Sequence, residues 1–446
     1  MPAVFLRRTT PERLRLLAAL TTGAAVVLLI ALTLVMTGVR EQVRLIGEEA
    51  APQAATSADL YFALSDLDAQ VTRILLAGDS DELAGSRIDA LGAYRERGYQ
   101  VDQDLQRSLT TGTGETERAI VLRLMDGLTV YRQRVGQALT ASASTPDTLG
   151  YYTQATNHLH LRLLPDAREL REKSIERLDD AYAEKAATET TGMTVAVLLG
   201  GALLALLILL QVWMAHRFRR TLNPALAIAT VLSVLLLVSA TVVLQSQSRL
   251  LSDGRDDGLG PYLALSELRA LGYDAAADTG RYVISANLSY YRDDFTAKSA
   301  CLSGEVACRA TAPAPTTGNP HGGGETVTTA ASARGGLPRL AGSVVVGRWT
   351  AYRTVHERIL ALADAGQTAE AVRLLTGIRR GDAAFDFAYF DASVADATGA
   401  REREFDRALR AAEITLTGWA FLPGVVLTVV LALIPFGVRK RLAEYR

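Results

Sequence analysis

The sequence predicts an all-α membrane protein with four transmembrane helices and two extracytoplasmic, up-down four-helix bundles arranged as a tandem duplication. Three observations predict this fold class. The 446-residue chain contains four long uncharged stretches, arginines recur on one side of those stretches, and the two long segments between them show helical hydrophobic periodicity. The resulting order is a span, a large domain and a span, repeated once.

Four stretches contain no Asp, Glu, Lys or Arg: Leu17–Met36, Met193–Trp213, Leu222–Leu244 and Ile414–Val438. A helix of about 20 apolar residues crosses the hydrocarbon core of a bilayer. We therefore predict transmembrane helices at residues 15–37, 192–214, 222–245 and 414–438. We expect the first to be an uncleaved span, because its apolar run is too long for a signal peptide and no small-residue cleavage site closely follows Met36.

Basic residues mark the short segments outside the spans. These segments are an N-terminal arm (1–14), a middle loop (215–221) and a C-terminal tail (439–446). Lys and Arg in short loops stay on the cytoplasmic side. We expect a multi-pass protein of the plasma membrane with both termini cytoplasmic and with residues 38–191 and 246–413 outside. The predicted cytoplasmic output contacts are Arg217, Arg219, Arg220, Arg439, Lys440 and Arg441.

Residues 38–191 show the periodicity of packed helices. Leu60, Leu64, Leu67, Val71 and Ile74 follow one another at intervals of three and four. This spacing places one apolar stripe along a helix. Pro52 is expected to kink that helix, and Gly78 to end it. A turn expected near residues 111–114 separates the second helix from the third, and one near residues 142–146 separates the third from the fourth. Four antiparallel helices with short loops form an up-down four-helix bundle.

The second half repeats features of the first. Residues 61–67, Tyr-Phe-Ala-Leu-Ser-Asp-Leu, correspond to residues 262–268, Tyr-Leu-Ala-Leu-Ser-Glu-Leu. We interpret this similarity as an internal duplication, although two helical bundles can share heptad patterning by chance. Only the second half contains a stretch rich in Gly, Pro, Thr and Ala, at residues 298–343, which we expect to be a flexible insertion.

Residues with catalytic or ligating chemistry are few. Cys301 and Cys308, the only cysteines, fall in the insertion, and an extracytoplasmic location favours a disulfide between them. His158 and His160 are two residues apart and point to different helix faces, which disfavours a metal site. We expect no enzymatic activity, no catalytic residue, no cofactor and no metal. The formal net charge of −1 also argues against nucleic-acid binding.

A turn in the second half could receive a partner. Gly366 separates two helices, and Arg379, Arg380 and Asp382 follow as possible contacts for a partner or ligand. The arginines are either solvated or able to bind a carboxylate. Four aromatic residues come next, Phe385, Phe387, Tyr389 and Phe390, and they are either core residues or an exposed docking surface.

Two resemblances follow from these residues. The Gly-x-x-x-Glu-Ala-x-x-Leu-Leu stretch at residues 366–375 resembles the ligand-sensing four-helix domains of bacterial chemoreceptors and sensor kinases. No linker, kinase or methyl-accepting coiled coil follows, so the resemblance is confined to the bundle. The whole plan is similar to GlnX-type actinobacterial membrane proteins. That resemblance implies a transducer between an amino-acid-binding lipoprotein outside and a cytosolic Ser/Thr kinase.

The function predicted from the sequence is therefore non-enzymatic signal transduction across a membrane. Expected partners are membrane lipids, a solute-binding lipoprotein, a cytosolic Ser/Thr kinase and a second copy of the chain. Direct binding of a small ligand is one alternative source of the signal. An envelope scaffold or assembly factor without a signalling role is the alternative function.

Overall fold

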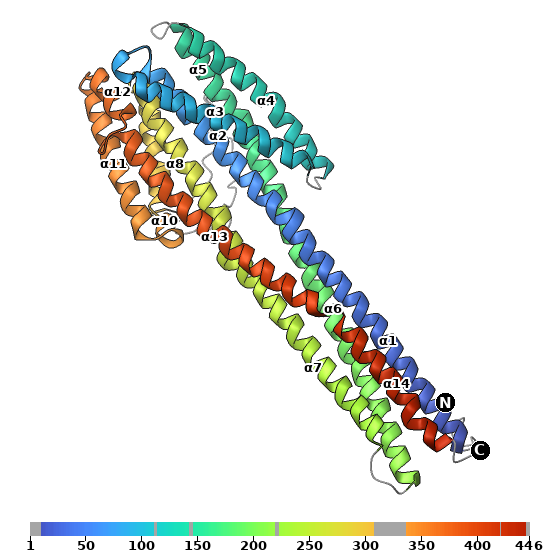
Figure 1. Cartoon of the computed structure of the whole chain (residues 1–446). Helices are drawn as coiled ribbons and strands as arrows, with labels where there is room; N and C mark the ends of the chain where they lie inside the picture. Colours follow the sequence, from blue (N-terminus) through green and yellow to red (C-terminus); the bar gives the residue numbers. More distant parts are fainter. Residues whose placement is uncertain are drawn as a thin grey trace, which may run out of the picture. The chain divides into compact units, whose positions relative to one another are not determined.

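Figure 1 shows the computed structural model, which describes residues 10–110, 114–141, 146–218, 223–306, 336–419 and 421–442. Regular structure in these residues is helical, as predicted. The α-helices are α1 (Thr10–Leu45), α2 (Ala51–Ala77), α3 (Ala84–Thr110), α4 (Glu115–Thr140), α5 (Pro146–His158), α6 (Leu164–Phe218), α7 (Pro224–Asp253), α8 (Gly260–Ile284), α9 (Ser289–Leu302), α10 (Gly336–Leu340), α11 (Ser343–Asp364), α12 (Thr368–Thr376), α13 (Ala383–Trp419) and α14 (Leu422–Leu442).

The chain divides into two compact units, each formed by segments that are distant in the sequence. Unit 1 comprises Met1–Glu48, Asp179–Gly254 and Asp406–Arg446, and unit 2 comprises Glu49–Leu178 and Arg255–Phe405. The four uncharged stretches therefore lie in unit 1. Most of the two long mixed segments lies in unit 2.

Unit 1 consists of apolar helices that lie side by side (Figure 1). Among the described residues, four helical stretches are long and apolar enough to cross a membrane, and they lie within Leu14–Ala77, Asp147–His216, Pro224–Ile284 and Ala383–Arg439. Leu28, Leu203, Leu236 and Leu427 belong to the buried core of this unit. Large apolar side chains on the outer faces remain exposed, including Leu34, Leu198, Leu235 and Val425. Such a surface is suited to hydrocarbon surroundings.

Side-chain amides tie α7 to the last part of the chain through backbone carbonyls. Asn223 Nδ2 donates to the Gly437 carbonyl at 2.7 Å, and Gln247 Nε2 donates to the Ala412 carbonyl at 2.8 Å. Both bonds link α7 or its N-cap to the last part of the chain. A buried amide that found no partner here would weaken the packing, so these bonds favour this pairing of segments.

Unit 2 has two hydrophobic cores. The first is formed by α2, α3, α4, α5 and the start of α6, and Tyr131 is fully buried in it. The second is formed mainly by α8, α9, α11, α12 and the start of α13, and Trp349 is fully buried in it. Helices α2 and α8 contact one another, so the two halves share an interface within unit 2 (Figure 1). The predicted bundle topology and duplication remain predictions.

Local changes of helix type precede three prolines in the described residues. Three π-helical segments occur, at Ile46–Ala50, Leu159–Leu163 and Gly254–Leu259, and each ends two residues before a proline. Proline has no N–H and its ring clashes with the carbonyl four residues earlier, so a wider turn accommodates it.

The predicted flexible insertion is narrower than residues 298–343. Lys298 to Leu302 form the end of α9, and Gly336–Leu340 form α10. Leu302 and Leu337 are fully buried in the second core. Both edges are helical because packing of these apolar side chains in the tertiary structure outweighs the weak local helix signal. Residues 307–335 lie outside the described residues.

Candidate functional site

A buried group of charged residues lies between α2 and α8. We call it the Arg281 cluster, and it consists of Asp68, His160, Asp274, Asp278, Arg281, Asp294 and Lys298. The side chains of Asp68, Asp278, Arg281 and Lys298 are at most 3% exposed. Charges this well buried are maintained only when they are paired and hydrogen-bonded.

Arg281 connects the two halves of unit 2. Its Nη2 donates to Asp68 Oδ2 of α2 at 2.6 Å, and its Nη1 donates to Asp278 Oδ1 of α8 at 2.6 Å. Nη2 also lies 2.9 Å from His160 Nε2, and Nη1 lies 3.1 Å from Asp274 Oδ1. The fixed fork of a guanidinium suits several acceptors at once, which a lysine would not provide.

Lys298 supplies the second cation. Its Nζ lies 2.6 Å from an oxygen of Asp274, 2.6 Å from an oxygen of Asp278 and 2.7 Å from an oxygen of Asp294. Four carboxyl groups therefore share two permanent cations. Because like charges repel strongly in a region of low dielectric, the cluster favours retaining a proton on one carboxyl group.

The surroundings of Asp274 and Asp278 shift the pKa values of these two carboxyl groups in opposite directions. Burial raises the pKa of Asp274, but Lys298, His160 and Arg281 outweigh it and the net shift is downward. Burial raises the pKa of Asp278, and the cations only partly offset this. Asp278 is thus the carboxyl group that holds a proton most readily within the pair.

His160 is neutral in this environment. Burial, followed by the neighbouring Arg281, lowers the pKa of His160 to about 4. A neutral ring can accept a hydrogen bond at Nε2, which agrees with the 2.9 Å contact to Arg281. The 3.7 Å separation between His160 Nε2 and Asp274 is therefore not a salt bridge at neutral pH.

Hydroxyl groups support the cluster from both halves. In the first half, Thr156 Oγ1 donates to Asp68 Oδ1 at 3.1 Å, and Thr72 Oγ1 lies 2.7 Å from the Tyr152 hydroxyl. In the second half, Thr279 Oγ1 lies 2.8 Å from His356 Nδ1. Burial lowers the pKa of His356 to about 3, so this imidazole is also neutral. These bonds limit the rotamers of the groups around Arg281.

An aromatic layer continues the interface beside the cluster. The Tyr273 ring of α8 packs edge-on against Phe62 of α2 at 5.2 Å and against Phe387 of α13 at 4.7 Å. The guanidinium groups of Arg97 and Arg269 lie 4.5 Å and 4.1 Å from the Phe62 ring centre. Cation–π contacts of this kind add to the burial of the ring.

The Arg281 cluster was not predicted from the sequence. Asp274, Asp278 and Arg281 are separated by four and three residues, so they lie on one face of α8. The same spacing describes a solvated helix face. One signal in the sequence was that this charged face lies within a helix otherwise rich in Ala, Leu and Tyr. Only the packing of α2 against α8 shows that the face is buried rather than solvated.

The predicted partner contacts lie elsewhere, at the turn between α12 and α13. Arg379 and Arg380 are exposed. Asp382 has a structural role there, because its Oδ2 accepts a hydrogen bond from the Arg379 backbone N–H at 2.9 Å and its carbonyl accepts one from Asp386 N–H in the first turn of α13. The two arginines remain available for a partner.

The four aromatic residues after this turn divide between the two predicted roles. Phe390 is fully buried in the second core, and Phe387 packs against it. Phe385 and Tyr389 are 38% and 55% exposed. Half of the group is therefore core, and half faces outward.

Several predicted residues lie outside the part of the chain that the structure describes. Cys308 is one of them, so the disulfide stays a prediction; Cys301 itself is buried at the end of α9. Arg219 and Arg220 are also outside, and nothing is described of the side chains of Arg217, Lys440 and Arg441. Arg439 is exposed near the end of α14. Within the described residues, no group of three His, Cys, Asp or Glu side chains could hold a metal.

Comparison with known proteins gives one family match. Residues 42–183 match the actinobacterial sensor domain. None of the curated proteins and none of the solved structures matches the chain. The match includes Asp68 and His160 of the Arg281 cluster and ends before the remaining members. The chain therefore carries an actinobacterial sensor domain at residues 42–183, whose buried Asp68 is paired by the other half of the chain.

Proposed function

We propose that this chain is a non-enzymatic transmembrane sensor that relays an extracytoplasmic signal to a cytosolic partner. The sensor domain at residues 42–183 is the observation that carries the proposal. The four candidate spans support a membrane location. The arginines of the short segments support an orientation with both termini in the cytoplasm and both large domains outside.

The finer architecture is part of the proposal. Each half of unit 2 is an up-down four-helix bundle, and the two bundles arose by duplication. The separate hydrophobic cores and the similarity between residues 61–67 and 262–268 support this. With two spans for each copy, both copies have the same orientation in the membrane.

The signal is an amino-acid-binding lipoprotein or a small ligand, and the cytosolic partner is a Ser/Thr kinase. The resemblance to GlnX-type proteins supports both assignments. The basic segment at residues 215–221 is too short for a catalytic domain and is suited to contact another protein. A homodimer would double the basic segments presented to that protein.

Helix α6 is suited to carry the signal. It extends as one helix from Leu164 to Phe218, with Leu170 in the first core of unit 2 and Leu203 in the core of unit 1. A signal that favours one arrangement of the sensor domain would shift α6 and alter the basic segment that follows it.

An engineered disulfide across the α2–α8 interface tests this proposal in the full chain. A Cβ atom built at Gly280 lies 3.5 Å from Thr72 Cβ, within the range for disulfides. Thr72→Cys/Gly280→Cys would therefore lock the two halves when oxidised. The readout is photo-crosslinked capture of cytosolic proteins by the chain in intact cells, with and without a mixture of amino acids.

We expect the wild-type chain and the reduced double variant to capture a kinase in an amino-acid-dependent manner. The oxidised variant should lose that dependence, and the single variant Thr72→Cys is the matched control. If locking leaves capture unchanged, or if no cytosolic protein is captured, the chain is an envelope scaffold instead. Cysteine labelling of tags at the two termini checks the orientation in the same cells.

A further inference from the structure

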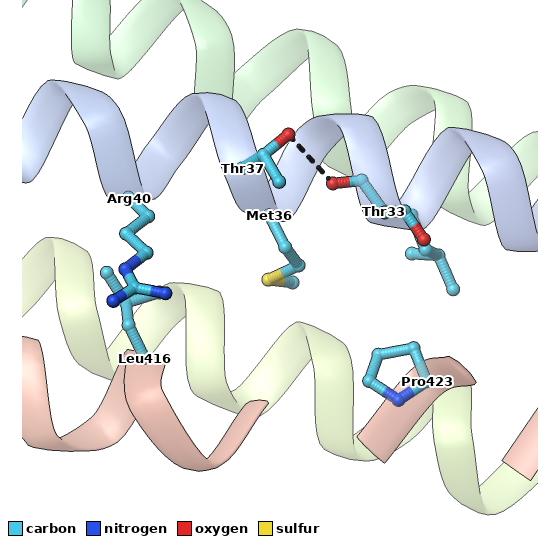
Figure 2. Close-up of a pocket in the computed structure, with 7 residues that line it drawn as sticks. Thr33, Met36, Thr37, Arg40, Leu416 and Pro423 are labelled. Carbon is cyan, nitrogen blue, oxygen red and sulfur yellow. Dashed lines mark hydrogen bonds between the residues drawn. The ribbon is translucent and has the colours of Figure 1, made fainter. Parts of the chain in front are cut away.

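A small cavity opens where α1 meets the junction of α13 and α14 in unit 1. Its volume is about 50 Å³, and it is lined by Leu32, Thr33, Met36, Thr37, Arg40, Leu416 and Pro423. Figure 2 shows Arg40 at one end of the cavity and Thr33 with Pro423 at the other. The cavity lies near the end of α13 at Trp419 and the start of α14 at Leu422.

The lining is apolar except at the Arg40 end. Leu32, Met36 and Leu416 are buried apolar residues. The Thr33 hydroxyl donates to the Leu29 carbonyl at 2.8 Å, and the Thr37 hydroxyl donates to the Thr33 carbonyl at 3.0 Å (Figure 2), so both are satisfied within α1. Apart from Arg40, the cavity therefore offers hydrocarbon rather than hydrogen-bonding groups.

Arg40 is a charge without a protein partner. It is exposed, and it forms no hydrogen bond or ion pair with any residue that the structure describes. Arg44, one turn further along α1, differs because it pairs with Glu41 at 2.6 Å and Glu48 at 3.1 Å. The nearest acidic side chains on α1 are thus already engaged, and the Arg40 guanidinium is available to an external anion.

The depth of Arg40 relative to the span identifies the type of anion. The predicted span ends at residue 37, so Arg40 lies about 4.5 Å beyond it along the helix. A headgroup layer is about 5–7 Å thick on each side of the hydrocarbon core. Arg40 is then at phosphate level, whereas Leu32 and Met36 lie at the level of the acyl chains.

We propose that this cavity binds one anionic phospholipid, with the phosphate at Arg40 and part of an acyl chain along Leu32, Met36 and Leu416. The assignment rests on the membrane placement in the proposed function. Phosphatidylglycerol fits better than phosphatidylcholine, because its headgroup has no ammonium to compete with the guanidinium for the phosphate. The lipid would fill the cavity between α1 and the residues Leu416 and Pro423, and would couple the lipid composition to the packing of the last span.

Native mass spectrometry of the full chain in detergent tests the site. The first bound lipid is titrated with phosphatidylglycerol and with phosphatidylcholine of the same acyl chains. Arg40→Gln is the test variant and Arg44→Gln is the matched control on the same helix. Thr33→Phe fills the apolar end while leaving Arg40 unchanged, and circular dichroism checks that each variant keeps its helices.

We expect wild type and Arg44→Gln to bind phosphatidylglycerol at least fivefold more tightly than phosphatidylcholine, and Arg40→Gln to lose that preference. Thr33→Phe should weaken binding of both lipids. Equal preference in Arg40→Gln and Arg44→Gln would overturn the site, and so would displacement of the lipid by inorganic phosphate alone. The disulfide experiment measures capture of cytosolic proteins, whereas this experiment measures lipid binding. Failure of the proposed function and failure of the lipid site can therefore be distinguished.

Discussion

At Arg281, one guanidinium group meets carboxylates from both halves of unit 2. Asp68 belongs to the matched sensor domain, whereas Asp278 belongs to α8 outside it. Burying such groups carries a large desolvation cost, which the mutual attraction offsets only when the geometry is good. A pair of this type therefore adds little net stability but makes the loss of either partner severe.

Replacing Arg281 with Met should destabilise the full chain by about 3–5 kcal/mol, because Asp68 would remain buried without its cation and Asp278 would keep only Lys298. The measurement is denaturant unfolding in detergent. Arg373→Met is the control, since the Arg373–Glu82 pair also joins the two halves but both side chains are more than half exposed. A loss at Arg281 no larger than the control would contradict the role given to the cluster.

Asp104 provides a pH-dependent contribution at the same scale. Burial, followed by the neighbouring Asp59, raises the pKa of Asp104 to about 7. A carboxyl group with a raised folded-state pKa binds its proton more tightly in the folded state. Stability is then lost as the pH rises from about 4, the unfolded pKa, to about 7, the folded pKa.

Asp104→Asn should remove this loss, so the variant gains stability relative to wild type at pH 8 and gains little at pH 4. Unfolding midpoints at the two pH values provide the comparison. Asp126→Asn, at an exposed position on α4, serves as the control and should show no such difference. A parallel pH profile for wild type and Asp104→Asn would contradict the assignment.

At the scale of helices, prolines and glycines set where the chain bends and where helices approach closely. The π-helical segment Gly254–Leu259 precedes Pro261 and brings Gly258 against α13. A Cβ atom at Gly258 would lie 2.8 Å from the Phe405 backbone nitrogen, so no larger residue fits without a backbone shift. Gly92, in the middle of α3, has open space around it.

Gly258→Ala should therefore destabilise the chain by about 1–3 kcal/mol through overpacking against backbone. Gly92→Ala should instead stabilise it by up to about 1 kcal/mol, because alanine loses less conformational freedom in a helix. Thermal unfolding of the two variants in detergent measures the loss of stability expected at Gly258 and the gain expected at Gly92. Equal effects at the two positions would show that the close approach at Phe405 does not restrict residue size.

At the scale of the whole molecule, the sensor domain depends on the rest of the chain. The interface between the halves includes apolar residues from both, with Phe62 and Ala69 packed against Ala270, Tyr273 and Ala277. Separating the halves would expose this surface together with the charges of the Arg281 cluster. Residues 42–183 have a hydrophobic core of their own but depend on the second half to cover this surface.

The same substitution should have different consequences in the two contexts. Asp68→Asn should destabilise the full chain, because Arg281 loses an ionised partner, but should leave an isolated 42–183 fragment nearly unchanged, because Asp68 is then solvated. Hydrogen exchange of the α2 backbone amides measures the change in stability in the full chain and in the fragment. A similar loss in chain and fragment would mean that Asp68 acts within the first half alone.

Much of the architecture could be predicted because it is encoded in local patterns. The span lengths, the helix end at Gly78 and the effect of Pro52 each depend on residues that are neighbours in the sequence. The spacing of Leu60, Leu64 and Leu67 likewise identifies a buried stripe, and all three are buried. The match of residues 42–183 to a sensor domain agrees with the expected sensing role.

The candidate site and the cavity could not be predicted in the same way. Asp68, His160, Arg281 and Lys298 come from four separate segments, and each is an ordinary surface residue by local pattern. Lys298 even falls in a stretch predicted to be flexible, yet its side chain is 3% exposed.

The sequence by itself determined the helical class, the four candidate spans and the regular positions of the helix breaks, because helix propensity, hydrophobic periodicity and span length act over short distances. Only the tertiary structure decided that α8 lies against α2, that Arg281 neutralises Asp68, and that Arg40 borders a cavity without a partner of its own. Those facts depend on desolvation and charge pairing between residues that are hundreds of positions apart, which no local pattern records.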